Sequence, residues 1–461
     1  MPGAPPPAAS SPPPAATAPP PIDTATAFPV IDLAPLLADD GDVWAACDGG
    51  SAPPAAAAAC AAIAACLAET GCVLVRDPRA GAADAAAFLD LLERYFAQPP
   101  EAKAADVRPE LHYQVNGEGG MRERETGRER EGHAWARRPP ATLSTPRPLT
   151  PYPFFRLPSL PLPSQVGATP EGIEEPACLR PPRREAEAAA LAALPSTSQP
   201  HWPTGADPKW RFFWRLGPRP ATTAFPELNA PPVVPAAFAA DWATVLDGWG
   251  GKMLGALDTV ARAAAVGLGL PSAALADLLA HGPHLLAPTG SDLGAHATPG
   301  TVLAGYHADL NLLTVHGRGR LPGLFVWTRA GERLPVSIPP GCLLLQAGLQ
   351  LERVTGGAVV AGRHEVIVTQ AAVDAVRAAL ASGEGPARAW RVSSTVFGHA
   401  ASDAVLRPLG PFAARPGVAA AYPPITAGAF VQSELEAICL KRKVGRAGAA
   451  GVSLDGGGEG G

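Results

Sequence analysis

Three stretches of the chain repeat apolar residues at helical spacing, and each predicts an amphipathic helix. They cover residues 55–68, 88–96 and 238–266. The first should end at Thr70-Gly71, because glycine commonly terminates helices, and the second should end at Pro99-Pro100. We interpret all three apolar stripes as faces that pack into a core rather than as cofactor-binding motifs.

Near residue 301 the pattern changes to short apolar runs separated by Gly and Pro, which is typical of strands joined by turns. We expect strands at residues 301–305, 310–315, 324–328, 342–346, 359–361, 365–369 and 391–397. Two earlier runs, 28–33 and 72–75, also read as extended segments. This pattern favours a mainly β protein with flanking helices, built as a sandwich or barrel, jelly rolls included.

The two ends of the chain differ from its middle in composition. The chain has 49 Gly and 55 Pro among its 461 residues, about twice the usual share of these two types. Residues 1–27 form a Pro/Ala-rich leader that lacks the features of a signal peptide, and residues 441–461 form a Gly-rich tail. We expect both to be disordered, because they cannot bury enough surface to offset the entropy of ordering. The short basic run Lys441-Arg442-Lys443 at the start of this tail also allows a nuclear-localisation signal, although three basic residues are few.

Charge and cysteine content exclude several classes of protein. No run of 18 bulky apolar residues exists, so we expect no transmembrane helix and no membrane partner. A formal net charge of −5 gives no reason to expect binding to nucleic acid. The 7 cysteines are odd in number and form no CxxC pair, which fits a reducing, cytoplasmic compartment.

Residues 115–165 match neither flank, since a mixed-charge run is followed by a Pro-rich run, both without apolar periodicity. Such a long structureless segment is unusual inside a compact domain. Val115 requires a codon that starts with GT, Gln165 can be encoded by CAG, and residues 151–164 are rich in residues with pyrimidine-rich codons. We hypothesise that the segment is a retained, translated intron; the alternative is a lineage-specific disordered loop. Neither places a functional residue there.

Three residues stand out as candidate metal ligands. His307 and Asp309 lie two apart in a predicted strand and therefore share a face, and His364 begins a later strand. Two histidines and one carboxylate form a facial triad that leaves open coordination positions on Fe(II). The pair alone is a weak signal, because a His and an Asp two apart occur by chance in many proteins.

A second pair strengthens the metal hypothesis. Arg391 and Ser393 follow His364 in the chain and again share a strand face. A guanidinium beside a hydroxyl suits a buried carboxylate, because arginine can bind it through two parallel hydrogen bonds. His316, which follows a predicted strand, we interpret as structural.

With these two groups of residues, the chain resembles the iron(II)- and 2-oxoglutarate-dependent dioxygenases, in particular their isopenicillin-N-synthase-like branch. The resemblance covers residues 28–114, as an N-terminal helical and strand part, and 166–440, as the core. Within the branch the chain is similar to a plant and algal group called clavaminate-synthase-like, through His284–Asp292 and Trp210–Trp214. Further runs that carry the resemblance are Asp309–Thr314, Pro322–Trp327, Pro339–Gln346 and Arg94–Phe96.

The resemblance implies a double-stranded β-helix core with Fe(II) at one open end. By position, His307, Asp309 and His364 would hold the iron, with no catalytic side chain beyond them. Arg391 and Ser393 would hold the distal carboxylate of 2-oxoglutarate, and dioxygen would be the third reactant. The implied reaction oxidises a small molecule, by hydroxylation or desaturation, and releases succinate and CO2. We expect a monomer.

The sequence also departs from the branch. Where many members have an Asn-x-Tyr that assists the cosubstrate, the aligned stretch reads His284-Leu285-Leu286. Asp309 is retained, which disfavours the halogenase variant. Two alternatives stay open: an Fe(II) oxidase on the same fold that does not use 2-oxoglutarate, and a non-enzymatic binding protein with a vestigial site.

The substrate itself is not readable from the sequence. An aromatic substrate pocket could include Trp210, Phe212, Trp214 and Tyr306. For the three residues of the 210–214 run, core packing is the favoured interpretation.

Overall fold

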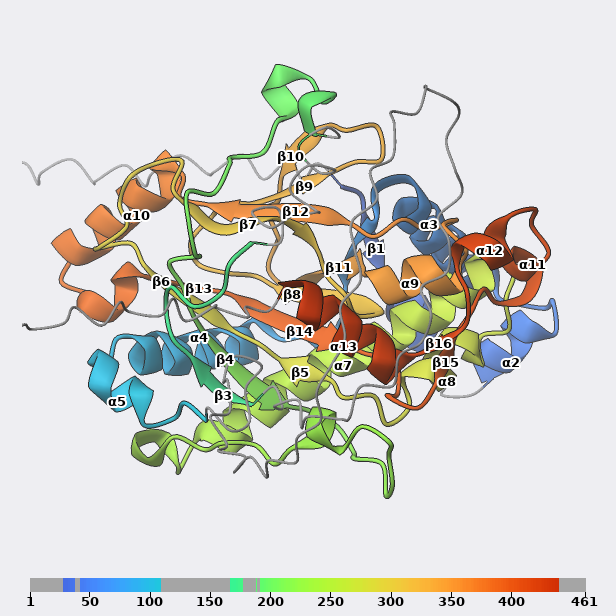
Figure 1. Cartoon of the computed structure of the whole chain (residues 1–461), viewed down its shortest axis with the longest axis horizontal. Helices are drawn as coiled ribbons and strands as arrows, with labels where there is room; N and C mark the ends of the chain where they lie inside the picture. The colour runs from blue at the N-terminus through green and yellow to red at the C-terminus, as the bar shows by residue number, and fades with distance from the viewer. Residues whose placement is uncertain (1–27, 38–41, 109–165, 177–187, 189–190, 439–461) are drawn as a thin grey trace, which may run out of the picture.

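The computed structural model describes residues 28–37, 42–108, 166–176, 188 and 191–438, and the expectations for residues 1–27, 115–165 and 441–461 lie outside this part of the chain. Two sheets face each other, and a layer of helices covers the outer face of the larger one (Figure 1). These antiparallel sheets with flanking helices agree with the mainly β expectation. No helix among the described residues combines the length and apolar character that spanning a membrane requires.

The larger sheet has the strand order β1-β2-β11-β8-β14-β5-β4-β6-β13, with β3 paired to β4 off this path. All its pairings are antiparallel except that of β1 with β2. Its strands are β1 (Val30–Asp32), β2 (Cys72–Arg76), β3 (Gly167–Thr169), β4 (Trp210–Arg215), β5 (Leu285–Leu286), β6 (Thr289–Asp292), β8 (Leu313–Gly317), β11 (Cys342–Ala347), β13 (Trp390–Val392) and β14 (Ser394–Gly398).

The smaller sheet has the order β10-β9-β12-β7 and is antiparallel throughout. Its strands are β7 (Val302–Ala308), β9 (Leu324–Trp327), β10 (Arg333–Pro335) and β12 (Arg363–Ile367). A separate ribbon pairs β15 (Val405–Leu406) with β16 (Ile425–Thr426). Strand β7 lies at one edge of the smaller sheet, so the edge position carries His307.

Helices surround the sheets and connect them. They are α1 (Ala34–Leu37), α2 (Asp42–Asp48), α3 (Pro54–Thr70), α4 (Ala82–Phe96), α5 (Pro100–Ala104), α7 (Trp242–Gly267), α8 (Ala273–Leu279), α9 (Leu349–Val354), α10 (Gln370–Ala381), α11 (Gly410–Ala413), α12 (Val418–Ala421) and α13 (Ala427–Ile438). Short 3-10 turns lie at Ser196–Ser198, Pro226–Asn229, Ala236–Phe238 and Pro386–Ala389.

The core has two apolar layers, which explains why β2 and β11 are apolar without alternation. Leu343 and Leu345 of β11 belong to the main cluster beneath the helices, whereas Leu344 belongs to a second cluster between the two sheets that also contains Val326 of β9. Strands buried on both faces read as continuous apolar runs. On β8, Val315 faces the helices and Thr314 and His316 face the other way; on β14, Val396 faces the helices and Thr395 and Phe397 face the other way.

Helix α7 crosses α3 at very short range. A Cβ atom placed on Gly267 would lie 2.3 Å from the carbonyl oxygen of Cys60, so only glycine fits at this crossing. Gly71 ends α3 in the left-handed conformation, with φ of 68°, as the sequence predicted.

Most of the predicted elements are present, and two strand predictions are wrong. The three predicted helices correspond to α3, α4 and α7. Residues 359–361 form no strand, because the backbone N–H groups of Val359 and Ala361 donate to the side chains of Thr355 and Glu352 instead of to a neighbouring strand. Residues 391–397 are divided between β13, which pairs with β6, and β14, which pairs with β8 and β5.

Candidate metal centre

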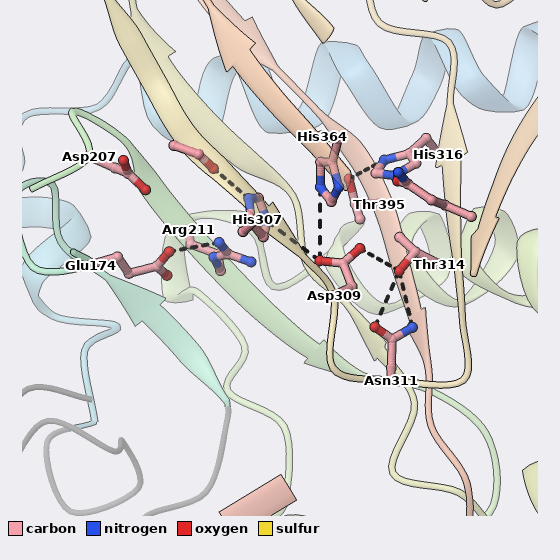
Figure 2. Close-up of polar contacts among 12 residues, drawn as sticks. Glu174, Asp207, Arg211, His307, Asp309, Asn311, Thr314, His316, His364 and Thr395 are labelled. Atoms are coloured by element: carbon pink, nitrogen blue, oxygen red, sulfur yellow. Dashed lines mark hydrogen bonds and ion pairs between the residues drawn. The ribbon is translucent and has the colours of Figure 1, made fainter. Parts of the chain in front are cut away.

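The space between the sheets contains the three predicted metal ligands. His307 of β7 is the direct register partner of His364 of β12, and Asp309 follows β7. The Nε2 atoms of His307 and His364 lie 3.6 and 3.9 Å from Oδ1 of Asp309. The ligand atoms of the three residues all lie within 4.8 Å of one another, and theirs is the one such group found among the described residues. Figure 2 shows the three side chains pointing toward one another. The structure therefore brings this predicted trio together.

Local hydrogen bonds leave one free ligand atom on His307 and one on Asp309. Nδ1 of His307 lies 2.6 Å from the carbonyl oxygen of Gly305, which only accepts, so Nδ1 carries the proton and Nε2 keeps its lone pair. Thr314 donates its hydroxyl to Oδ2 of Asp309 at 2.6 Å, which leaves Oδ1 free. Asn311 in turn contacts the hydroxyl of Thr314 at 3.1 Å.

The protonation states also suit a metal. Burial alone would raise the pKa of Asp309, but His364 and His307 outweigh it and hold that pKa below its ordinary value. Burial, helped by the neighbouring His307, lowers the pKa of His364 to about 3. An ionised carboxylate and a neutral imidazole are the forms that bind metals.

His316 lies behind His364 rather than among the ligands. The rings of the two histidines are 5.8 Å apart, and Nε2 of His316 lies 3.2 Å from Oε1 of Gln346. Its Nδ1 lies 3.4 Å from the hydroxyl of Thr395. Its position agrees with the structural role that the sequence suggested.

Arg391 lies on β13 as a partly buried cation without an acidic partner. Its Nε donates to the carbonyl of Pro322 at 3.0 Å, and no carboxylate among the described residues pairs with it. Burial lowers the pKa of Arg391 to about 10. Its charge contributes to the lowered pKa of His316, after the larger effect of burial, so Arg391 lies within electrostatic reach of the site.

Ser393 keeps a hydroxyl proton to donate. Its Oγ accepts from the backbone N–H of Thr289 at 2.9 Å and lies 2.9 Å from the hydroxyl of Thr289. With Oγ fixed by these contacts, its own O–H can point to an anion bound by Arg391. Thr289 was not singled out from the sequence, because nothing local marks a strand threonine as a partner of a residue so distant in the chain.

The aromatic residues proposed for a substrate pocket do not face the triad, which corrects that alternative. Trp210, Phe212 and Trp214 belong to the main core cluster, and the ring of Phe212 lies 4.8 Å from that of Trp242 on α7. Tyr306 packs against Trp327 at 4.8 Å, on the face of β7 opposite to His307. Successive side chains in a strand point to opposite faces, which is why these aromatic side chains face away from the triad.

The stretch His284–Leu286, where the family resemblance would place a tyrosine that assists the cosubstrate, consists of buried residues. Leu286 is fully buried in the main core, and His284 accepts from the backbone N–H of His399 at 3.2 Å. Burial, followed by the charge of Arg215, lowers the pKa of His284 to about 3. This segment therefore serves packing.

Solved structures with a similar fold are 2-oxoglutarate-Fe(II) oxygenases. A full-length Neurospora crassa protein, in complex with alpha-KG and thymine, matches with a TM-score of 0.57 at 15% identity, over 90% of this chain and 98% of that one. A protein of Caulobacter crescentus assigned to the 2OG-Fe(II) oxygenase family matches with a TM-score of 0.54 at 20% identity, over 89% and 99%. No protein-family model and no curated protein matches the chain by sequence. At these identities the likeness establishes a shared fold.

Proposed function

We propose that this protein is a non-haem Fe(II)- and 2-oxoglutarate-dependent oxygenase that oxidises a small molecule. The observation that carries the proposal is the convergence of His307, Asp309 and His364 within 4.8 Å, on the fold of such oxygenases. The two facing sheets then correspond to the double-stranded β-helix that the family resemblance implies. We place the chain in the isopenicillin-N-synthase-like branch on the sequence motifs alone.

The residues present fit an Fe(II) ion. Nε2 of His307, Nε2 of His364 and Oδ1 of Asp309 are the donor atoms that would hold it, a set that suits non-haem iron. Thr314 and the Gly305 carbonyl orient two of these ligands, a role that outer partners commonly have. When bound, Fe(II) with 2-oxoglutarate supplies the activation of dioxygen for substrate oxidation, with release of succinate and CO2.

Arg391 and Ser393 would hold the distal carboxylate of 2-oxoglutarate. The guanidinium of Arg391 is partly buried and has no acidic partner among the described residues, and such a charge is costly unless an anion pairs with it. The open N–H groups of Arg391 and the hydroxyl of Ser393 supply donors for that anion. Their task is to orient the cosubstrate and to exclude water from its charged end.

A small organic substrate fits this proposal, because the similar Neurospora crassa protein has been solved with thymine and with 5-formyluracil. The choice between hydroxylation and desaturation depends on where the substrate places its C–H bonds. The residues of the proposed metal centre do not themselves determine which of the two reactions occurs.

Succinate formation from 2-oxoglutarate is the direct test. The purified chain, supplied with Fe(II), ascorbate and 2-oxoglutarate, should release succinate slowly without a substrate and faster with one. The Asp374→Ala variant, altered at an exposed site on α10, should behave like the wild type. Oxygen consumption without succinate would support the oxidase alternative, and a chain that retains no iron would leave only a binding role.

A further inference from the structure

A largely buried group of two acids and two bases lies next to His307. It consists of Glu174, Asp207, Lys209 and Arg211, which we call the mixed-charge cluster. Nζ of Lys209 lies 3.0 Å from Glu174 and 2.5 Å from Asp207, and Nη2 of Arg211 lies 2.7 Å from Glu174. Figure 2 shows Glu174, Asp207 and Arg211 on the His307 side of the triad. The metal centre makes no use of these residues.

Strand β4 aims Arg211 into the space between the sheets. Phe212 and Trp214 face the helices, so Arg211 and Phe213 face the other way. The guanidinium carbon of Arg211 lies 5.8 Å from the centre of the Phe397 ring. Phe397 of β14 is the register partner of Thr314, which holds Asp309, so Arg211 stands beside a ring that borders the triad.

Asp207 also lies near the triad, close to His307. Burial raises its pKa, and Lys209 and His307 act against that rise, which puts Asp207 within electrostatic reach of the triad. Its Oδ1 atom is buried without any hydrogen-bond partner among the described residues, and so is Nε of Arg211. One unpaired acceptor and one unpaired donor in a single cluster are costly unless a ligand engages them.

One terminal nitrogen of Arg211 is bound to Glu174, and the other is available to a ligand. Glu174 fixes Nη2, while Nη1 has no partner among the described residues and is not one of the buried unpaired atoms. The side chain of Arg211 is 15% exposed. A clamped guanidinium with an open N–H edge is prepared to donate to an oxygen atom of a ligand.

The net charge of the mixed-charge cluster indicates which kind of ligand oxygen Arg211 would bind. The positive charges of Lys209 and Arg211 are already matched by Glu174 and Asp207. A carboxylate ligand would therefore add an uncompensated buried charge, whereas a carbonyl oxygen would accept a hydrogen bond without that cost.

We infer that the mixed-charge cluster is the substrate-recognition site, with Arg211 as the anchor, and that the substrate is an uncharged small molecule bearing a carbonyl oxygen. Asp207 takes an N–H or O–H of the same molecule when its side chain turns towards it. The inference rests on the proposed function, because it assumes that the triad beside the cluster is the oxidising centre.

Binding of matched probes near the metal tests the inference without any turnover. The full chain would be loaded with Mn(II) in place of Fe(II) and with 2-oxoglutarate. The probes are two pairs that differ only in charge: phenylacetamide with phenylacetate, and benzamide with benzoate. The paramagnetic broadening of the probe's proton signals reports both affinity and closeness to the metal. We expect an amide to bind at least tenfold more tightly than its carboxylate partner.

Three variants make the test specific for Arg211. Arg211→Leu should weaken amide binding by about tenfold or more, the value of a hydrogen bond to a charged donor. Arg211→Lys keeps a charge for Glu174, so it guards against misfolding, yet it presents no second nitrogen and should show the same loss. Arg219→Leu removes an exposed arginine and should bind like the wild type.

The outcomes separate the two proposals. If Mn(II) and 2-oxoglutarate bind but neither amide is broadened, or the carboxylates bind better, or both Arg211 variants bind like the wild type, the recognition inference is overturned alone. If the chain holds neither Mn(II) nor 2-oxoglutarate, the proposed function is overturned and the inference with it.

Discussion

At the residue scale, the ligand set depends on single side chains whose loss has no substitute nearby. Asp309 supplies the only carboxylate of the described metal group and is buried between two histidines. Asp309→Ala should therefore abolish iron retention and succinate formation together. Iron analysis after desalting checks this, with Asp374→Ala as the exposed control. Full iron retention in Asp309→Ala would contradict the assigned ligand set.

A second residue-scale prediction concerns the partner of that carboxylate. Thr314→Val removes the hydroxyl that lies 2.6 Å from Oδ2 of Asp309 while keeping the shape of the side chain. Metal affinity should fall by about 10- to 100-fold, the usual effect of removing an outer partner of a ligand. Thr314→Ser keeps the hydroxyl and should remain close to the wild type in a Mn(II) titration.

Arg391 should matter through its shape as well as its charge. Arg391→Lys replaces a two-nitrogen fork by a point charge, so the concentration of 2-oxoglutarate needed for half-maximal succinate release should rise about tenfold or more. Arg377→Lys, on the exposed face of α10, is the matched control. An unchanged requirement would indicate that Arg391 serves something other than 2-oxoglutarate.

At the scale of elements, the contact between α3 and α7 offers a paired test. Gly267→Ala would place Cβ 2.3 Å from a backbone carbonyl, so the helices must separate. The free energy of unfolding should fall by about 1–3 kcal/mol, as overpacking usually costs. Gly251→Ala, on the same helix with nothing within 4 Å of the new Cβ, should instead stabilise the protein by about 0.5–1 kcal/mol. Urea titrations of both variants would measure these changes.

Helix α5 carries a buried lysine that makes stability depend on pH. Nζ of Lys103 lies 4.3 Å from the ring centres of both Trp210 and Trp390 and donates to the carbonyl of Phe96. Burial lowers its pKa from 10.5 to about 8. Between these two values the unfolded chain binds the proton more tightly, so stability should increase as pH rises through that window.

The Lys103→Met variant isolates this effect. It should lack the rise in stability between about pH 8 and pH 10, and the difference from the wild type is on the order of 3 kcal/mol. Denaturant titrations of both proteins at each pH measure it. Parallel pH profiles for the two proteins would refute the assignment to Lys103.

The elements also show what the sequence can predict. The three helices and the strands around His307 and His364 follow from apolar periodicity, because each has one face in the core. The division of residues 391–397 between two partners does not, since pairing depends on distant strands such as β6. On strand β4 the favoured interpretation of core packing holds for Trp210, Phe212 and Trp214, whereas nothing in the sequence singled out the intervening Arg211.

For the candidate site, spacing and the family resemblance led to the predicted metal ligands and to Arg391, but neither pointed to the residues that hold them in place. Thr314 and Thr289 act through contacts that the fold creates. Asp207 and Glu174 are brought to His307 by segments that carry no motif of their own. Side chains whose role depends on contacts with distant segments carry no recognisable local sequence pattern.

At the scale of the whole molecule, the described segment that ends at Arg108 and the one that begins at Val166 lie side by side. The backbone N–H of Ala168 donates to the carbonyl of Asp106 at 3.1 Å. A chain without residues 115–165 can therefore keep this contact, and loop closure depends only weakly on length. The deletion variant should keep its metal affinity and its melting temperature within a few degrees. A large loss of either would show that the segment is part of the working protein.

The hydrogen bond between Asp106 and Ala168 has a consequence for gene structure. A messenger RNA with this segment and one without it would encode proteins that both contain this backbone contact and the same three candidate metal ligands. Alternative splicing at this point would then alter the surface of the protein, or its lifetime in the cell, without changing the candidate metal centre. The same junction is a natural place to fuse a reporter domain whose own ends lie close together.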